Sequence, residues 1–289
     1  MTTQRRMPSI WTRLPIWLRA IVVGLLTAAT SANVWLLLLL NLRVRLAAVL
    51  EVLFLALFLW WAHGGGPPRA AQVFRRNAFR RSQLTSRQWA WGLIAALGFA
   101  AIVHASIVLL FRVVAYPEVA FRRGYDLSFI PSHPLRWVAV IVSAASAAIC
   151  EETGFRGFMQ QPIELRYRVP VAVFISSLFF LALHLTKAWA SLGMVPIVFG
   201  AGLLLGLLAR SAGSLIPGIV GHFVMDVGLF AYWWTGIAGN FTQRPITETG
   251  LDLPFFIASC VFVTSLFLTL FSISRLRRVG SSDELMRSP

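Results

Sequence analysis

The sequence predicts an all-α polytopic membrane protein with about eight transmembrane helices packed in one bundle. Of its 289 residues, 57% are hydrophobic, whereas an ordinary soluble domain has about 45–50%. The apolar residues come in blocks of about 17–25, which is the length of a helix that crosses a bilayer. The basic residues are almost all arginine and lie at the ends of those blocks, as in loops that face anionic lipid headgroups.

Each apolar block is expected to be a helix, because a backbone in lipid must satisfy its own hydrogen bonds. The first block follows a basic N-terminus and is too long for the apolar core of a signal peptide, so we expect it to be a retained helix. The second block is short and carries Glu51. The predicted spans are 16–40, 46–62, 89–112, 136–156, 170–186, 190–210, 214–234 and 254–273.

The distribution of arginine predicts the orientation of the bundle. The N-terminal tail 1–15, the acid-free loop 63–88 and the C-terminal tail 274–289 are arginine-rich and lie on one side of an eight-span arrangement. Such segments face the cytoplasm, so both tails are expected to be cytoplasmic, flanking one transmembrane domain over 16–273. Arginine usage and the lack of organelle signals indicate a prokaryotic plasma membrane. The net charge of +15 is explained by these membrane-flanking arginines, and no nucleic-acid partner is expected.

Ionisable residues in three of the spans are unexpected, because each costs roughly 2.5–3.5 kcal/mol at the centre of a membrane helix. Residues four positions apart share one face of a helix, and this spacing recurs in all three spans. It allows an ion pair between Glu152 and Arg156. It also places the Asp226 carboxylate beside the His222 imidazole, and the Phe180 ring beside His184. The candidate site residues are Glu151, Glu152, Arg156, His184, His222 and Asp226.

Glu151 is the member of this set without a cation of its own. Arg156 pairs with Glu152, so Glu151 faces another direction on the helix. A carboxylate in a site of low dielectric holds its proton more readily, and it can act as a base toward water. His184 could share that proton, which makes water the expected nucleophile.

Three stretches, "EETGFR", "FLALH" and "HFVMD", resemble in order the EExxxR, FxxxH and HxxxN/D motifs of the CPBP family. That family comprises type II CAAX prenyl proteases and membrane proteins of bacteriocin processing or immunity, and the resemblance covers roughly 136–234. It implies an intramembrane endopeptidase of glutamate type, in which Glu151 activates water with the help of His184. Glu152 and Arg156 would hold the first motif in place, while His222 and Asp226 would stabilise the oxyanion or position the water.

The sequence departs from the prenyl-protein proteases at Asp226, where they carry asparagine. An asparagine amide donates a hydrogen bond to an oxyanion, whereas an ionised aspartate only accepts. Asp226 must therefore be protonated, or it serves only to orient His222.

Other functions stay open from the sequence alone. Glu151, His184, His222 and Asp226 could instead bind a divalent metal such as zinc, although no cofactor is required by the hydrolytic interpretation. Buried acids and histidines also form proton relays in transporters, and an immunity or scaffold protein could keep the motifs without catalysis. For the enzyme, the expected partners are the lipid bilayer and a peptide or membrane-protein substrate; the oligomeric state is undetermined.

Three structural expectations accompany the site. The helix of the fourth span should continue past Arg156 through "GFMQQPIEL", which places the site within the membrane and open toward the cytoplasm. Gly202 and Gly206 form a GxxxG pattern that favours close helix packing. Pro217 could kink the seventh span just before His222.

Overall fold

The computed structural model describes residues 13–32, 44–80, 83–123, 125–239 and 244–287. Throughout these ranges the regular structure is helical, which confirms the predicted fold class. Six stretches are long and apolar enough to cross a membrane, and two further apolar helices are shorter, so the count of eight spans is not confirmed. The six are α4 (Val44–Ala62), α6 (Ser86–Val113), the stretch His133–Glu164, α12 (Met194–Ala212), the stretch Ile216–Trp234 and α15 (Leu253–Arg287).

The two shorter helices are α2 (Ile16–Ala29), extended by the turn η1 (Thr30–Ala32), and α10 (Val169–Leu183). The remainder of the first predicted span, 33–40, lies outside the described residues, as does most of the N-terminal tail. Both short helices pack against η3 (Thr153–Gln160) of the long stretch His133–Glu164, and η1 packs against α8 (His133–Glu152). Their ends thus place polar residues inside the bundle.

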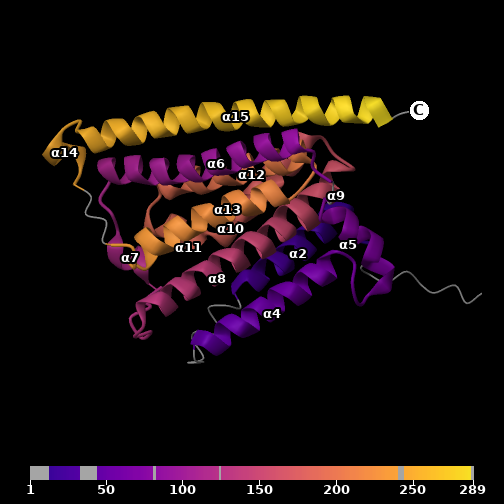
Figure 1. The fold of residues 1–289 in the computed structure, drawn as a ribbon. Coiled ribbons are helices and arrows are strands. Elements are labelled where there is room, and N and C mark those ends of the chain that lie inside the picture. Colours follow the sequence, from indigo (N-terminus) through magenta and orange to yellow (C-terminus); the bar gives the residue numbers. More distant parts are fainter. Residues whose placement is uncertain (1–12, 33–43, 81–82, 124, 240–243, 288–289) are drawn as a thin grey trace, which may run out of the picture.

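The helices form one bundle around α13 (Ile216–Gly228), which packs against α6 on one side and α8 (His133–Glu152) on the other. Figure 1 shows α15 lying along α6 at one edge, and α4 beyond α8 at the opposite edge. The helices α10 and α12 pack against each other.

α13 begins at Ile216, so Pro217 lies in its first turn, where proline is compatible with a helix. The predicted kink at Pro217 is wrong.

The fourth span continues beyond Arg156, as predicted. It runs through α8, the π-helical segment η3 and α9 (Gln161–Glu164) without a break. The π-helical segment itself was not predicted, and such segments are frequent at functional sites. It places the backbone of Gly154 directly against α2, where a Cβ on Gly154 would lie 2.5 Å from the carbonyl oxygen of Gly24.

Gly154→Ala is expected to destabilise the fold by about 1–3 kcal/mol, since the added methyl group would overlap backbone that cannot move aside. Gly200→Ala is the matched control, because nothing lies within 4 Å of a Cβ at that helical glycine. Thermal unfolding of both variants in detergent measures the difference. Equal unfolding temperatures for the two variants would contradict the close contact between α2 and η3.

The predicted packing of the GxxxG pattern is confirmed. A Cβ on Gly202 would lie 3.0 Å from Ser177 of α10, and one on Gly206 would lie 2.8 Å from the side chain of Gln160. The backbone carbonyls of both glycines accept hydrogen bonds at this contact. The Arg156 guanidinium donates to Gly202 at 3.2 Å, and the Gln160 side-chain amide donates to Gly206 at 2.9 Å. Small residues here therefore admit polar side chains as well as a neighbouring helix.

The arginine-rich loop 63–88 folds onto the end of the bundle where α9 ends. Its short helix α5 (Gln72–Ala78) buries Arg75, whose guanidinium donates to the carbonyls of Trp61, Gly65, Gly66 and Pro68 over 2.7–3.0 Å. Arg80 pairs with Glu164 at 2.8 Å. The loop thus contains a short helix with one arginine turned inward.

The two ends of the bundle differ in charge. The loop 63–88, Arg166, Arg168 and the C-terminal turns of α12 and α15 lie at one end, where Arg277 donates to Ser211 at 3.1 Å. Figure 1 shows α5, α9 and the C-terminus at this end, and α7 (Glu118–Arg122) and α14 (Ile246–Thr249) at the other. We call the first the arginine-rich end.

Candidate active site

Glu152 and Arg156 form the ion pair that their spacing predicts. The guanidinium donates to Glu152 Oε1 at 2.9 Å, and both side chains are fully buried. The guanidinium also lies 4.6 Å from the centre of the Phe180 ring, a cation–π contact. The pair therefore joins the end of α8 to α10 and α12.

Glu152 also holds His222, which was not predicted. The Nδ1–H of His222 donates to Glu152 Oε1 at 2.9 Å, so one carboxylate oxygen accepts from both Arg156 and His222. Asp226 lies instead on the other side of the ring, with Oδ2 3.5 Å from Nε2. We expected Asp226, four residues along the same helix, to orient the imidazole. Glu152 of α8 is the closer partner of the ring, so Asp226 alone does not orient it.

His184 lies where α10 ends, which corrects the single predicted span 170–186. α10 stops at Leu183, and α11 (Leu185–Ala190) begins directly after His184. The Nδ1–H donates to the carbonyl of Phe180 at 2.8 Å, and the two rings lie 4.5 Å apart, as the spacing predicts. A carbonyl oxygen can only accept, so in the neutral imidazole Nε2 carries the lone pair.

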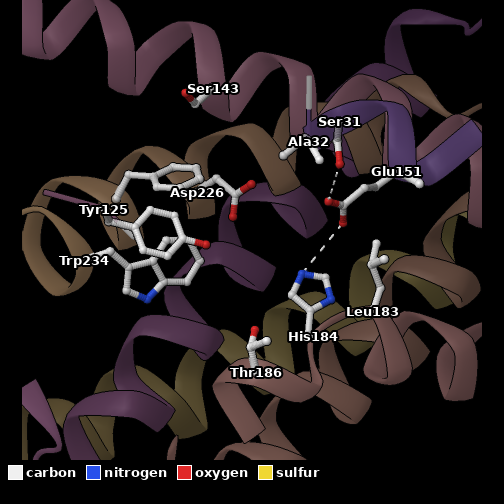
Figure 2. Close-up of a pocket in the computed structure, with 13 residues that line it drawn as sticks. Ser31, Ala32, Tyr125, Ser143, Glu151, Leu183, His184, Thr186, Asp226 and Trp234 are labelled. Carbon is white, nitrogen blue, oxygen red and sulfur yellow. Dashed lines mark hydrogen bonds and ion pairs between the residues drawn. The ribbon is translucent and has the colours of Figure 1, made fainter. Parts of the chain in front are cut away.

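Glu151 points into the bundle and faces both histidines. Its Oε2 lies 3.8 Å from His184 Nε2 and 4.0 Å from His222 Nε2. Its Oε1 accepts a hydrogen bond from the hydroxyl of Ser31 at 3.2 Å. Figure 2 shows Ser31, Glu151 and His184 arranged in this order. Ser31 was missed by sequence reasoning, because nothing in an apolar segment 120 residues away marks it as a partner.

The six candidate residues therefore come together from α8, η3, the junction of α10 and α11, and α13, next to a cavity of about 250 Å³. Glu151, His184 and Asp226 line this cavity directly, while Glu152, Arg156 and His222 lie behind them. The other lining residues are three alanines, three aromatic residues, three serines or threonines, and one leucine. They are Ala29, Ser31, Ala32, Tyr125, Ser143, Ala147, Leu183, Thr186, Phe230 and Trp234.

The cavity extends away from the arginine-rich end. Ser143 and Ala147 precede Glu151 by two turns and one turn of α8. Tyr125 lies in the connection between α7 and α8, and Thr186 lies in α11, which contacts α7. The sequence predicted that the arginine-rich end faces the cytoplasm and also that the site opens toward the cytoplasm. The cavity opens at the other end of the bundle. The cytoplasmic orientation of the arginine-rich end and the cytoplasmic opening of the site therefore cannot both hold, and each stays a prediction.

The metal alternative does not fit the arrangement of donors. Ligands around tetrahedral zinc, each at about 2.0–2.1 Å, lie about 3.3 Å from one another. Glu151 Oε2 lies 3.8 and 4.0 Å from the two imidazole nitrogens, and only the pair of His222 and Asp226, at 3.5 Å, approaches that spacing. Among the residues that the structure describes, no group of three potential ligands could hold a metal ion. We therefore derive no step through a metal.

The fold and the site define a class: an integral membrane protein with a carboxylate–imidazole cluster enclosed by its helices. Residues 132–228 match the family model described as type II CAAX prenyl endopeptidase Rce1-like. This confirms the resemblance to the CPBP family, and all six candidate residues lie inside the matched segment, which is about one third of the chain. Searches of curated proteins and of solved structures find no match.

Proposed function

We propose that this protein is an intramembrane endopeptidase of glutamate type, which cuts a peptide or a membrane-anchored protein. The family match supports the role of a CAAX-type intramembrane protease. The observation that carries the proposal is the position of Glu151, whose Oε2 faces Nε2 atoms from two other helices at 3.8 and 4.0 Å beside a cavity.

These two separations fit a shared water molecule. They exceed the range of a direct hydrogen bond, and polar groups at such distances are commonly bridged by water. One water between Glu151 and the two imidazoles would lie within reach of all three. Its protons could go to the two acceptors, the Glu151 carboxylate and the Nε2 lone pair of neutral His184.

Hydrolysis would then proceed in two steps. Glu151 takes one proton from water as the oxygen attacks the scissile carbonyl carbon, and the carbonyl electrons move to its oxygen, which becomes an oxyanion. When this oxyanion collapses, the C–N bond breaks and the leaving nitrogen takes the proton back from Glu151. The products are a new carboxyl terminus and a new amino terminus, and the enzyme is unchanged.

The buried pair of Glu152 and Arg156 would position His222 in this reaction. Because Glu152 accepts from Nδ1–H, the other ring nitrogen faces the water. When His222 is protonated, Nε2–H can donate to developing negative charge. Asp226 Oδ2 lies 3.5 Å from the same nitrogen.

Comparing peptide termini in membranes from cells that carry wild-type protein or Glu151→Gln tests the function. We expect new termini with wild type that are lost with Glu151→Gln and retained with Glu248→Gln, the same change at an exposed carboxylate of α14. No difference in any terminus would contradict the protease. Proton-driven solute flux into proteoliposomes that survives Glu151→Gln would favour the transporter instead.

We also propose that both termini are cytoplasmic and that substrate reaches the site from the opposite side of the membrane. In a Cys260→Ser background, Thr186→Cys at the cavity is expected to react with a membrane-impermeant maleimide in intact cells. Arg210→Cys, exposed at the arginine-rich end, should react only after permeabilisation. The reverse pattern would place the cavity on the cytoplasmic side.

A further inference from the structure

Tyr125 lies at the cavity but outside the segment that matches the family model. It belongs to the connection between α7 and α8, whereas the match begins at residue 132. It lines the cavity together with Glu151, His184 and Asp226. Figure 2 shows its phenol oxygen directed into the space between Asp226 and His184.

The ring of Tyr125 is held by aromatic packing and by its backbone. It lies 5.1 Å from the ring of Trp234 and 5.8 Å from that of Phe230, both in the segment η4 (Leu229–Trp234) that follows α13. Its backbone N–H donates to the carbonyl of Arg122 at 3.0 Å. The phenol therefore approaches the cavity on a supported side chain, and its position is coupled to the helix that carries His222 and Asp226.

The proposed hydrolysis needs a donor for the oxyanion, and the cavity is rich in acceptors. Glu151 and Asp226 are carboxylates, and His184 presents a lone pair at Nε2 because its other nitrogen donates to Phe180. Asp226 occupies the position at which asparagine would supply an amide donor, and it can donate only when its carboxyl group is protonated. His222 donates from Nε2 only when it is protonated.

A phenol can fill this role as long as it stays neutral. Burial raises the pKa of the Tyr125 hydroxyl, and the nearby charges of Asp226 and Glu151 raise it further. The hydroxyl therefore keeps its proton through the physiological range. A neutral phenol beside two carboxylates is a hydrogen-bond donor that needs no proton transfer to become active.

We propose that Tyr125 is a further catalytic residue, which donates a hydrogen bond from its phenol hydroxyl to the oxyanion formed on the scissile carbonyl. The inference rests on the proposed function and adds to it a donor that the three family motifs do not contain. Tyr125 transfers no proton in this step. It stabilises the tetrahedral intermediate more than the substrate, which is the property expected of an oxyanion donor.

Tyr125→Phe tests the inference, because phenylalanine keeps the ring that packs on Phe230 and Trp234 and removes only the hydroxyl. With a peptide substrate, we expect kcat to fall by about 10²–10³-fold, as for the loss of one oxyanion donor, while KM stays within a few-fold. A phosphinic peptide, which mimics the tetrahedral intermediate, should lose affinity to a similar degree. Tyr232→Phe, at an exposed tyrosine of η4, is the matched control and should behave as wild type.

Three outcomes would overturn the role of Tyr125. They are an unchanged kcat with unchanged KM, an unchanged kcat with a raised KM, and unchanged phosphinic-peptide affinity, each in a Tyr125→Phe protein whose unfolding temperature equals that of wild type. Failure of the proposed function looks different, because the wild-type protein itself would then show no hydrolysis. If Tyr125→Phe unfolds, Tyr125→Leu, whose side chain is apolar and has no hydrogen-bond donor, must show the same loss of kcat.

Discussion

Replacing Glu151 with glutamine is expected to lower kcat for peptide hydrolysis by about 10²–10⁴-fold, the usual contribution of a general base. Glutamine has the same shape as glutamate, and its amide oxygen can still accept the hydrogen bond from Ser31. It cannot take a proton from water at neutral pH. The loss should therefore appear in kcat, measured with purified protein and a substrate found from its termini.

The stability of the Glu151→Gln protein separates a chemical effect from a structural one. We expect its membrane level and unfolding temperature to match wild type, because the change removes a charge from a site with low exposure and leaves the packing intact. Glu248→Gln should retain full kcat. Hydrolysis by Glu151→Gln within tenfold of wild type would exclude Glu151 as the base.

Arg156→Met is expected to destabilise the fold by about 3–5 kcal/mol, because it leaves Glu152 buried without its cation. The ion pair between the two residues is fully buried, and the same guanidinium donates to Gly202 of α12 and packs on Phe180 of α10. Its loss should thus loosen three elements at once. Thermal unfolding in detergent and the amount of protein in the membrane measure the effect.

The double variant Glu152→Met and Arg156→Met distinguishes the charge from the packing. Removing both charges should restore much of the stability, since a buried ion pair is often replaceable by apolar side chains. Hydrolysis should stay lost, because the Nδ1–H of His222 then has no carboxylate to hold it. If Arg156→Met alone is as stable as wild type, the buried pair does not have the structural role assigned to it.

Contacts within one helix could be predicted from the sequence, because helical periodicity fixes which residues share a face. The pairing of Glu152 with Arg156 and the packing of His184 on Phe180 follow from a spacing of four. The apolar blocks likewise gave the fold class, and the continuation of the fourth span to Glu164 is observed. These features depend on local geometry alone.

Contacts between helices could not be predicted in this way. The bond from His222 to Glu152 and the bond from Ser31 to Glu151 join residues 70 and 120 positions apart. Their geometry depends on how deeply each helix is set in the bundle. The helix breaks at His184, and a π-helical segment follows Glu152. Both features change the depth of the side chains in the bundle from the depth that a regular α-helix would give.

The direction in which the site opens illustrates the same limit. The depth of Glu151 along its helix was read as an opening toward the cytoplasm. In the structure, α9 and the loop 63–88 cover the arginine-rich end of the bundle, with Arg80 bound to Glu164. The cavity instead extends past Ser143 and Ala147, and only the fold of the loop shows this.

A double-mutant cycle on Glu151 and His184 tests the central claim most directly, since the claim is that both side chains act on one water molecule. Residues that act as a unit have non-additive effects on kcat. We therefore expect Glu151→Gln combined with His184→Gln to hydrolyse peptide about as slowly as the slower single variant. A double variant whose loss equals the product of the two single losses would show that Glu151 and His184 act independently, and would contradict the account.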